Sequence, residues 1–254
     1  MFRIVIPARF GSTRLPGKPL KDLRGRPMLQ WVHEVGQASG AAEVIIATDD
    51  DRILAAAREF GARACMTSLT HQSGTDRIAE VALQAGWADD DIVVDLQGDM
   101  PMVPSSLPGQ VAALLQQYPE AAIATLATRV TSVAQLLDPT IVKVVTDKSG
   151  RALYFSRAPI PWGRDSAPAT LVSQRSFAGA RRHVGLYAHR VAALRRLSML
   201  PPSQLEQIEK LEQLRALENG LEIRVADAVA DPGPAVDTHE DLARVTILMS
   251  RAEV

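Results

Sequence analysis

The stretch of the sequence that decides the fold is Ile4-Val5-Ile6-Pro7-Ala8-Arg9-Phe10-Gly11-Ser12-Thr13-Arg14-Leu15-Pro16-Gly17-Lys18. Its apolar run predicts a short buried strand, and the loop that follows contains two glycines, two hydroxyl side chains, two arginines and one lysine. Backbone N–H groups, hydroxyls and cations at the end of a strand are typical of a site for a polyanion such as a phosphate group. The loop is not a Walker loop, because Gly17-Lys18 is followed by Pro19 instead of serine or threonine. It also lacks the three spaced glycines of a dinucleotide fingerprint.

Short apolar runs alternate with helical patterns along the rest of the first half of the chain. We predict strands over residues 3–7, 43–48, 91–96, 122–128 and 141–147, and helices over 27–36, 50–60, 74–85 and 108–117. Val/Ile-rich strands that alternate with helices predict an α/β fold, with a mixed, mostly parallel sheet and helices on both faces. In such sheets, ligands bind beyond the carboxyl ends of the strands. The loop at residues 9–18, Thr48-Asp49 and Gln97-Gly98-Asp99 each follow a predicted strand and obey that rule.

The pattern changes after Gly150. We predict strands over 153–157 and 182–189, a loop over 159–168, one continuous helix over 203–219, a strand over 223–226 and a helix over 244–249. The long helix is expected to stop at Asn219-Gly220, because glycine commonly ends helices. No internal repeat or low-complexity linker divides the sequence. We therefore predict a single domain over residues 1–254, with an inserted segment at about residues 150–200.

Composition excludes several classes of protein. The formal net charge of −1 shows no basic footprint for nucleic acid or a membrane surface. Cys65 is the single cysteine, which excludes an internal disulfide and favours a reducing compartment. The sequence has no signal-peptide pattern and no apolar run of membrane-spanning length. We expect a cytoplasmic protein without nucleic-acid or membrane partners.

Seven further motifs follow the first loop. They are His71-Gln72-Ser73-Gly74-Thr75-Asp76-Arg77, Leu96-Gln97-Gly98-Asp99, Val142-Lys143-Val144-Val145, Leu153-Tyr154-Phe155-Ser156-Arg157-Ala158-Pro159-Ile160-Pro161-Trp162, Arg182-His183-Val184-Gly185-Leu186-Tyr187, Leu211-Glu212-Gln213-Leu214-Arg215 and Val236-Asp237-Thr238. With these motifs in this order, the sequence resembles the CMP-Kdo synthetases, the CTP:3-deoxy-manno-octulosonate cytidylyltransferases. The resemblance implies a Rossmann-like, GT-A-like nucleotidyltransferase fold. It also implies transfer of CMP from CTP to an acidic acceptor, with Kdo as the leading candidate, release of pyrophosphate, and a homodimer formed through the segment after residue 150.

Arg14 and Lys18 are the cations that we expect to act on the phosphates. Fixed cations lower the barrier of in-line attack on an α-phosphate, because charge develops on its oxygens and on the departing pyrophosphate. The alternative, two solvated surface cations, is disfavoured by their position among glycine, proline and hydroxyl residues. With Asp99 they form the predicted catalytic set. The resemblance also implies CTP contacts at Pro7, Ala8, Arg9, Gly11, Ser12, Thr13, Lys18, Ser73, Gly74, Arg77 and Gln97, although the run from Ser73 also fits an ordinary helix start.

Asp99 and Asp237 are the candidate metal ligands. A nucleoside triphosphate usually binds with Mg²⁺, which takes a few carboxylate oxygens and completes its shell with water and phosphate. The alternative is that each aspartate caps a turn or a helix, and Asp237 before Thr238 fits an N-terminal cap. The resemblance favours metal binding, because the magnesium-binding aspartates of the family fall on these two positions.

The acceptor-binding set is implied by the resemblance alone and comprises Arg157, His183, Tyr187, Glu212 and Gln213. On the predicted helix over 203–219, Glu212 lies at the edge of an apolar face traced by Leu205, Ile208, Leu211 and Leu214 (or Leu217). Its carboxylate fits either an ion pair with Arg215 or a contact to a sugar hydroxyl. A lone His183 is more often a structural residue than a ligand-binding one.

Two positions depart from the family pattern. Met100 stands where the family has glutamate, and Asp95 replaces the family's asparagine. One interpretation is tolerated drift. The other is an altered acceptor, since the loss of a nearby negative charge favours a more highly charged acceptor such as the phosphonate phosphonoformate. A further alternative, a non-catalytic CTP sensor, is disfavoured because Lys18, Asp99 and Asp237 are all retained.

Overall fold

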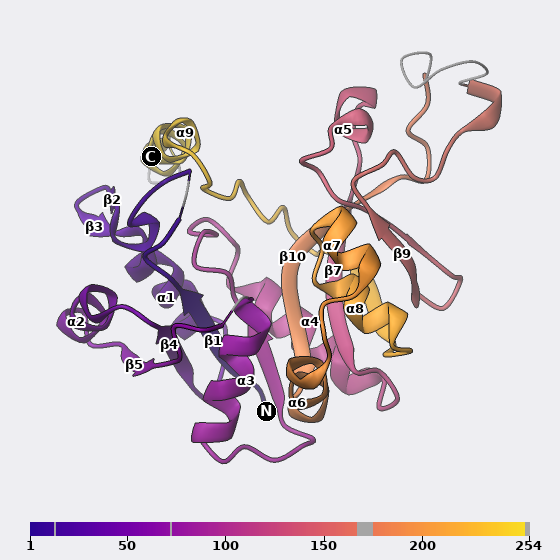
Figure 1. Cartoon of the computed structure of the whole chain (residues 1–254). Helices are drawn as coiled ribbons and strands as arrows, with labels where there is room; N and C mark the ends of the chain where they lie inside the picture. The colour runs from indigo at the N-terminus through magenta and orange to yellow at the C-terminus, as the bar shows by residue number, and fades with distance from the viewer. Residues whose placement is uncertain (13, 72, 167–174, 252–254) are drawn as a thin grey trace.

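A mixed sheet organises the computed structural model, which describes residues 1–12, 14–71, 73–166 and 175–251. Within these ranges nine strands form the sheet, in the order β11-β7-β10-β6-β1-β4-β5, with β8 on β10 and β9 on β8 (Figure 1). The strands are β1 (Arg3–Ala8), β4 (Val44–Thr48), β5 (Arg63–Met66), β6 (Ile92–Asp95), β7 (Ile123–Arg129), β8 (Lys143–Thr146), β9 (Ala152–Ser156), β10 (Arg181–Arg190) and β11 (Ile223–Asp227). A separate hairpin joins β2 (Asp22–Leu23) and β3 (Arg26–Pro27).

The helices of the described ranges cover both faces of the sheet. They are α1 (Met28–Ala38), α2 (Asp51–Glu59), α3 (Gly74–Gln84), α4 (Ser106–Gln117), α5 (Val133–Leu137), α6 (Val191–Met199), α7 (Gln204–Glu209), α8 (Gln213–Glu218) and α9 (His239–Arg251), with 3₁₀ turns η1 (Lys18–Leu20) and η2 (Arg164–Ser166). The predicted α/β fold with a mixed, helix-covered sheet is confirmed. Among the described residues, no helix combines the length and apolar character needed to cross a membrane.

The half of the sheet around β1 is parallel and apolar on both faces. β1 pairs in parallel with β4 on one side and β6 on the other. Ile4 and Ile6 are fully buried in the core cluster that includes α1, α2 and α4, whereas Val5 is buried among side chains of α3 and α6. Because successive side chains of a strand point to opposite faces, this run is apolar without alternation.

The other half is built around β10, which pairs antiparallel with β6, β7 and β8. The register with β7 shifts between Val184 and Tyr187, so Gly185 and Leu186 form an irregularity of the bulge type. Leu186 and Ala188 remain in the main core cluster. Tyr187 and His189 therefore lie on the opposite face, above the α6–α8 side of the sheet.

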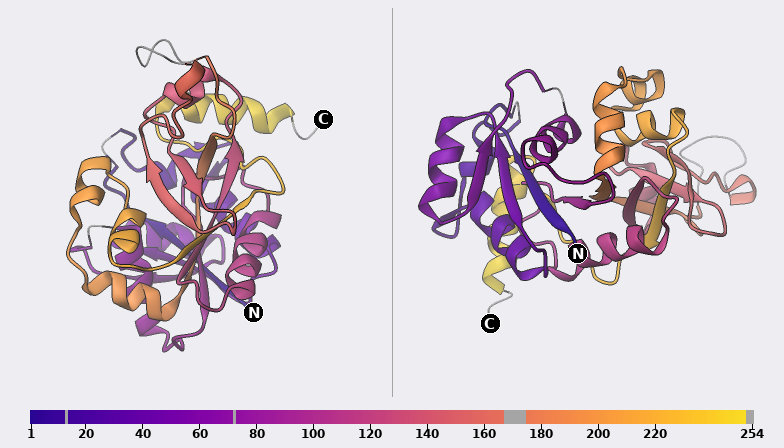
Figure 2. Two further views of the ribbon diagram at one scale, coloured as in Figure 1. Left: turned by 90° about the vertical axis from the view of Figure 1, so that its right-hand side faces the viewer. Right: turned by 90° about the horizontal axis from the view of Figure 1, so that it is seen from below.

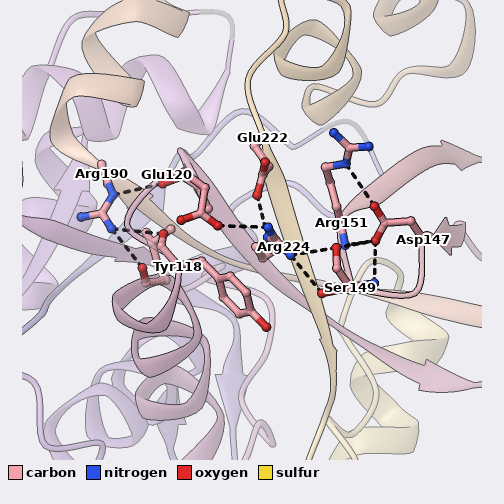
Figure 3. A network of polar contacts seen from close by, with 10 residues as sticks. Tyr118, Glu120, Asp147, Ser149, Arg151, Arg190, Glu222 and Arg224 are labelled. Carbon is pink, nitrogen blue, oxygen red and sulfur yellow. Dashed lines mark hydrogen bonds and ion pairs between the residues drawn. The ribbon is translucent and has the colours of Figure 1, made fainter.

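Arg224 on β11 ties the β8–β9 hairpin to this half of the sheet (Figure 3). Its guanidinium donates to the Ser149 carbonyl at 2.9 Å and to Ser149 Oγ at 3.0 Å. It also pairs with Glu120 at 3.0 Å and Glu222 at 2.6 Å, and lies 4.1 Å from the ring centre of Tyr118. With an exposed fraction of 8%, this cation is balanced inside the protein and serves the fold.

The C-terminal part of the chain returns to the first loop. Leu15, Leu23, Val236 and Val245 are buried together in one cluster with Met28. Figure 1 and the right-hand view of Figure 2 accordingly show yellow α9 beside the indigo N-terminal elements. This packing brings the segment before α9 to the loop that follows β1.

Most predicted elements agree with the observed ones to within one or two residues at their ends, but two helices differ. The helix predicted over 244–249 begins earlier, at His239. The helix predicted over 203–219 is wrong, because it is two helices, α7 and α8, with Lys210 between them at a φ of 54°. In addition, the strands β2, β3 and β5 and the helices α5 and α6 were not predicted.

A buried ion pair explains the break between α7 and α8. Arg215 donates to the two Glu206 carboxylate oxygens at 2.8 and 2.6 Å, and both side chains are largely buried. In one straight helix these residues would lie about 13.5 Å apart along the axis, too far to pair. The break also leaves Ile208 68% exposed, so this residue does not belong to the apolar face expected from the sequence.

Candidate active site

A continuous cleft follows the carboxyl edge of β1 and β6. Among the described residues, three cavities make it up, of about 340 Å³ beside Lys18, about 180 Å³ in the middle and about 400 Å³ beside β10. Gln97 lines all three, and Arg9 lines the first two. The cleft thus connects the loop expected to bind phosphate with the residues expected to bind the acceptor.

Local backbone geometry shapes the loop after β1. Gly17 has a φ of 67°, and its N–H donates to the Phe10 carbonyl at 3.1 Å. A Cβ at this position would come 3.1 Å from the Phe10 ring, so glycine suits both the conformation and the space. The Leu15 N–H donates to Ser12 Oγ at 3.3 Å, while the Leu15 side chain is fully buried. The loop is therefore anchored on one side and presents its polar residues to the cleft.

Lys18 lies at the centre of a charged cluster. Its Nζ is 2.8 Å from Asp99 Oδ2 and 3.1 Å from Asp237 Oδ1, and Arg14 is 3.1 Å from the same Asp237 oxygen. Burial opposes the charge of Lys18, but Asp99 and Asp237 outweigh it, so the pKa of Lys18 lies above its ordinary value. The structure thus brings together all four residues that the sequence analysis assigned to phosphate and metal.

The two carboxylates reach this cluster from different loops. Gly98 allows the loop after β6 to approach β1, because a Cβ there would lie 3.1 Å from the Pro7 carbonyl oxygen. The Val236 N–H donates to the Asp99 carbonyl at 2.9 Å, which places Asp237 alongside. Thr238, not Asp237, caps α9, because Thr238 Oγ1 accepts from the Asp241 N–H at 3.1 Å. The capping alternative for Asp237 is therefore wrong, and its carboxylate faces the cleft.

Most of the residues expected to bind CTP line the cleft, and Thr13 lies outside the described residues. Those lining its first two cavities are Pro7, Ala8, Arg9, Gly11, Ser12, Lys18, Ser73, Gly74, Arg77 and Gln97. Ser73 and Arg77 also have structural roles next to the cleft. Ser73 Oγ caps α3 by accepting from the Asp76 N–H at 3.0 Å, as the helix-start alternative predicted. The buried Arg77 guanidinium donates to Thr67 Oγ1, and to Asp49 at 2.6 Å.

The five residues expected to bind the acceptor line the third cavity: Arg157, His183, Tyr187, Glu212 and Gln213. Glu212 accepts from Thr75 Oγ1 at 2.9 Å, which links α8 to the first turn of α3. The alternative of an ion pair between Glu212 and Arg215 is wrong, because Arg215 pairs with Glu206. This leaves the exposed Glu212 carboxylate as a hydrogen-bond acceptor at the cavity.

Arg157 is held in place by backbone carbonyls. Its Nε donates to the Glu209 carbonyl at 2.7 Å and its Nη1 to the Pro139 carbonyl at 3.0 Å. Fully buried Lys143 donates to the Arg157 carbonyl at 2.6 Å and to two further carbonyls. Hydrogen bonds thus fix both the guanidinium and the backbone carbonyl of Arg157 at the cavity wall.

A row of rings forms the β10 side of the cavity. The ring centres of His183 and Tyr187 are 5.2 Å apart, and those of Tyr187 and His189 are 5.8 Å apart. His183 Nε2 is 3.0 Å from Thr125 Oγ1. Burial, assisted by Arg182, lowers the pKa of His183 to about 3, so its ring is neutral near pH 7. A neutral ring can donate and accept hydrogen bonds but supplies no positive charge.

Asp95 and His189 also line the acceptor cavity, although neither was predicted from the sequence to bind the acceptor. Asp95 pairs across the sheet with Tyr187, and both of its carboxylate oxygens lie 2.7 Å from Gln97 Nε2. Burial, and then the charges of Glu212 and Asp99, raise the pKa of Asp95 well above its usual range. The period-two pattern His183, Tyr187, His189 on one strand, with Gly185 between, was the available signal for His189.

The two departures from the family pattern lie in different environments. Met100 is 7% exposed and packs in the main core cluster with Val103 and Leu107. It lines none of the cavities described above. Its position does not support the hypothesis that Met100 alters the acceptor, whereas Asp95 does face the acceptor cavity.

Comparisons with known proteins identify the family of this chain. A family described as cytidylyltransferase matches residues 3–223. The 3-deoxy-manno-octulosonate cytidylyltransferase of Thioalkalivibrio sulfidiphilus is 53% identical over 98% of both chains. That of Pseudomonas syringae pv. tomato is 52% identical, also over 98% of both.

Two solved structures are similar to this chain in fold. A CMP:2-keto-3-deoxy-manno-octonic acid synthetase complexed with CTP superposes with a TM-score of 0.86 at 43% identity, covering 99% of this chain and 100% of that one. A cytidylyltransferase from Leptospira borgpetersenii shares the fold, with a TM-score of 0.63 at 18% identity over 98% of this chain and 86% of that one. By its sequence and its fold, this chain belongs to the cytidylyltransferase family.

Proposed function

We propose that this protein transfers CMP from CTP to 3-deoxy-manno-octulosonate (Kdo), giving CMP-Kdo and pyrophosphate. The observation that carries the proposal is one cleft with two chemically different ends. One end holds Arg14 and Lys18, suited to a triphosphate, and the other holds rings and hydrogen-bonding groups suited to a sugar. The relatives at 52–53% identity are named for Kdo, which favours the sugar acid over the phosphonate alternative.

Each end has a separate task in this reaction. Arg9, Ser12 and Lys18 bind the phosphates, and Ser73, Arg77 and Gln97 adjoin the rest of the nucleotide. Arg157, His183, Tyr187, Glu212 and Gln213 bind the acceptor. Its anomeric hydroxyl attacks the α-phosphate near Gln97, the residue common to both ends. Lys18 and Arg14 then stabilise the charge that grows on the departing pyrophosphate.

We also propose that Asp99 and Asp237 hold Mg²⁺ together with CTP. Their carboxylate oxygens converge on one ammonium group, and oxygen is the donor that Mg²⁺ prefers. Among the described residues no group of three or more metal-ligating side chains is gathered, so phosphate oxygens and water must complete the shell. The ion, when bound, supplies Lewis-acid polarisation of the phosphates.

A homodimer formed through the segment after residue 150, in the cytoplasm, completes the proposal. The mass of the purified protein by sedimentation equilibrium tests the dimer. A value near twice 27.5 kDa is expected, and a value near 27.5 kDa contradicts it.

A pyrophosphate-release assay tests the activity. Purified protein is incubated with CTP and Mg²⁺ and with Kdo, other sugar acids or phosphonoformate, each in turn. We expect release with Kdo that depends on both CTP and the metal. Release with phosphonoformate but not Kdo would restore the phosphonate alternative, and no release with any acceptor would favour the nucleotide sensor.

A further inference from the structure

His189 is a buried polar side chain with no hydrogen-bond partner in the part of the chain that the structure describes. It is 4% exposed, lines the acceptor cavity, and has no hydrogen bond at either ring nitrogen. Gln213, 8% exposed and lining the same cavity, likewise has no partner at Nε2. Buried polar atoms are nearly always paired, because leaving them unpaired is costly. Two unpaired groups on one cavity indicate that a ligand supplies their partners.

His183 provides an internal comparison on the same strand. Both histidines are buried beside Tyr187, whose ring lies between them. His183 Nε2 is hydrogen-bonded to Thr125 Oγ1 at 3.0 Å, whereas neither ring nitrogen of His189 has a hydrogen-bond partner. Packing alone therefore does not account for a histidine at position 189, where an apolar ring would leave nothing unpaired.

The register of the sheet places His189 away from the reacting end of the cleft. β6 ends at Asp95, which pairs with Tyr187, while His189 pairs with Val93. Two residues of a strand span about 6.8 Å, so His189 lies about that much further from the edge at which Gln97 follows β6. An acceptor whose reacting hydroxyl lies near Gln97 would extend its far end toward His189.

The chemistry at this end suits a carbon chain with hydroxyl groups. Ile123 and Leu197 line the cavity as apolar wall, and His189 and Gln213 supply the unpaired polar atoms. Burial lowers the pKa of His189 to about 4, so near pH 7 one ring nitrogen donates and the other accepts. A hydroxyl can do both, whereas a carboxylate can only accept.

We propose that His189, together with Gln213, binds the hydroxylated tail of the acceptor and thereby sets the length of acid that the enzyme prefers. In Kdo this tail is the two-carbon unit attached to the sugar ring. The inference rests on the proposed function, because it takes the cavity as the acceptor site. It makes His189 a specificity-determining residue that lies away from the reacting atoms.

The experiment compares two acceptors in two proteins. One acceptor is Kdo, and the other is the six-carbon 3-deoxy-2-ulosonic acid, which keeps the carboxylate and ring but lacks the tail. For each, kcat/KM is measured, or Ki against Kdo where turnover is too slow. We expect His189→Phe to lower kcat/KM for Kdo about tenfold, equal to about 1.4 kcal/mol, and to change the short acceptor less than twofold.

Two further variants make the result specific. His189→Gln keeps a donor and an acceptor, and we expect it to recover most of the preference for Kdo, even if the phenylalanine variant folds poorly. His33→Leu removes a comparably buried histidine on α1, whose Nε2 is paired with Gln37, and should leave the preference unchanged.

An equal loss for both acceptors in His189→Phe, or a glutamine variant that has lost the preference completely, would overturn the inference. Failure of the wild type to use Kdo at all would instead overturn the proposed function, so the two failures are distinguishable.

Discussion

The two halves of the sheet form their parts of the cleft in different ways. In the parallel half, the groups lie in loops that follow β1 and β6, such as Lys18 and Asp99. In the antiparallel half, they come from the face of a strand, as with Tyr187, and from the break between two short helices, as with Glu212. Loops at the carboxyl edge are short and local, whereas the strand face and the helix break depend on distant contacts.

This difference also separates two uses of charge. Lys18, Arg14, Asp99 and Asp237 share their charges at the surface of the cleft, where a ligand can replace one partner with another. Arg224 is enclosed by its carboxylates and a serine, and its network holds the β8–β9 hairpin in place (Figure 3). In the nucleotide half, charged side chains pair with groups that a bound ligand can replace. In the acceptor half, the ion pairs of Arg224 mainly hold secondary-structure elements together.

The largest expected effect concerns the two carboxylates that pair with Lys18. Asp99→Asn and Asp237→Asn should each lower kcat/KM at least a hundredfold, about 3 kcal/mol, because each removes one carboxylate from the proposed metal site. Activity of the wild type should disappear in EDTA and return with Mg²⁺. Asp90→Asn, an exposed change elsewhere, is the control. Near-normal turnover by either cleft variant would show that its carboxylate is not needed for metal.

Lys18→Ala should have the next largest effect. The charge that Lys18 meets grows as pyrophosphate departs, so the contact strengthens in the transition state. We expect kcat to fall about thirtyfold, about 2 kcal/mol, and more than the KM for CTP rises. Steady-state kinetics with varied CTP measures the split, with exposed Lys148→Ala as control. A change confined to KM would mean that Lys18 binds the ground state and the transition state equally.

The same contrast explains what the sequence could predict. The loop after β1 has a local signature, and the structure places Lys18 at the cleft as that signature indicated. The start of α3 at Ser73 also has a local signature, whereas the place of Ser73 at the cleft was implied by the family resemblance. Asp95 has no local signature for the acceptor cavity, because only the pairing of β10 with β6 brings it there. For His189 the only local signal is its period-two spacing from His183 and Tyr187, which does not by itself place it in a cavity. The break at Lys210 was missed for a similar reason, since it depends on the buried Glu206–Arg215 pair.

Met100→Glu should have a smaller effect, and it tests whether Met100 serves the hydrophobic core or the acceptor site. Because Met100 is buried among apolar side chains, a carboxylate there would lose hydration without gaining a partner. We expect the free energy of unfolding to fall by about 2 kcal/mol, with the ratio of kcat/KM for Kdo and phosphonoformate unchanged. Met100→Leu, which conserves volume, should be nearly neutral. A tenfold change in that ratio would show that Met100 influences the choice of acceptor.

The smallest expected effect concerns Asp95, on the strand that joins the two halves. Its pKa is raised above the unfolded value by burial and by Glu212 and Asp99, so the folded protein retains a proton that the unfolded chain releases. Stability that is present at acid pH is therefore lost as the pH rises toward the folded-state pKa. An asparagine side chain has no such proton to release. Asp95→Asn should consequently raise the melting temperature by about 2–4 °C at pH 8, on the scale of 1 kcal/mol, and by less at pH 4.5.

Thermal unfolding of the wild type and Asp95→Asn across this pH range, followed by circular dichroism, measures the difference. The Gln97 amide can turn to keep a hydrogen bond with asparagine, because its oxygen and nitrogen occupy nearly the same space. A stabilisation that is equal at both pH values, or larger at pH 4.5, would mean that Asp95 is ionised in the folded protein and held by Gln97. The acceptor cavity would then carry the negative charge of Asp95 beside Gln97, and the hydroxyl-binding end proposed at His189 would lie two strand residues beyond that charge.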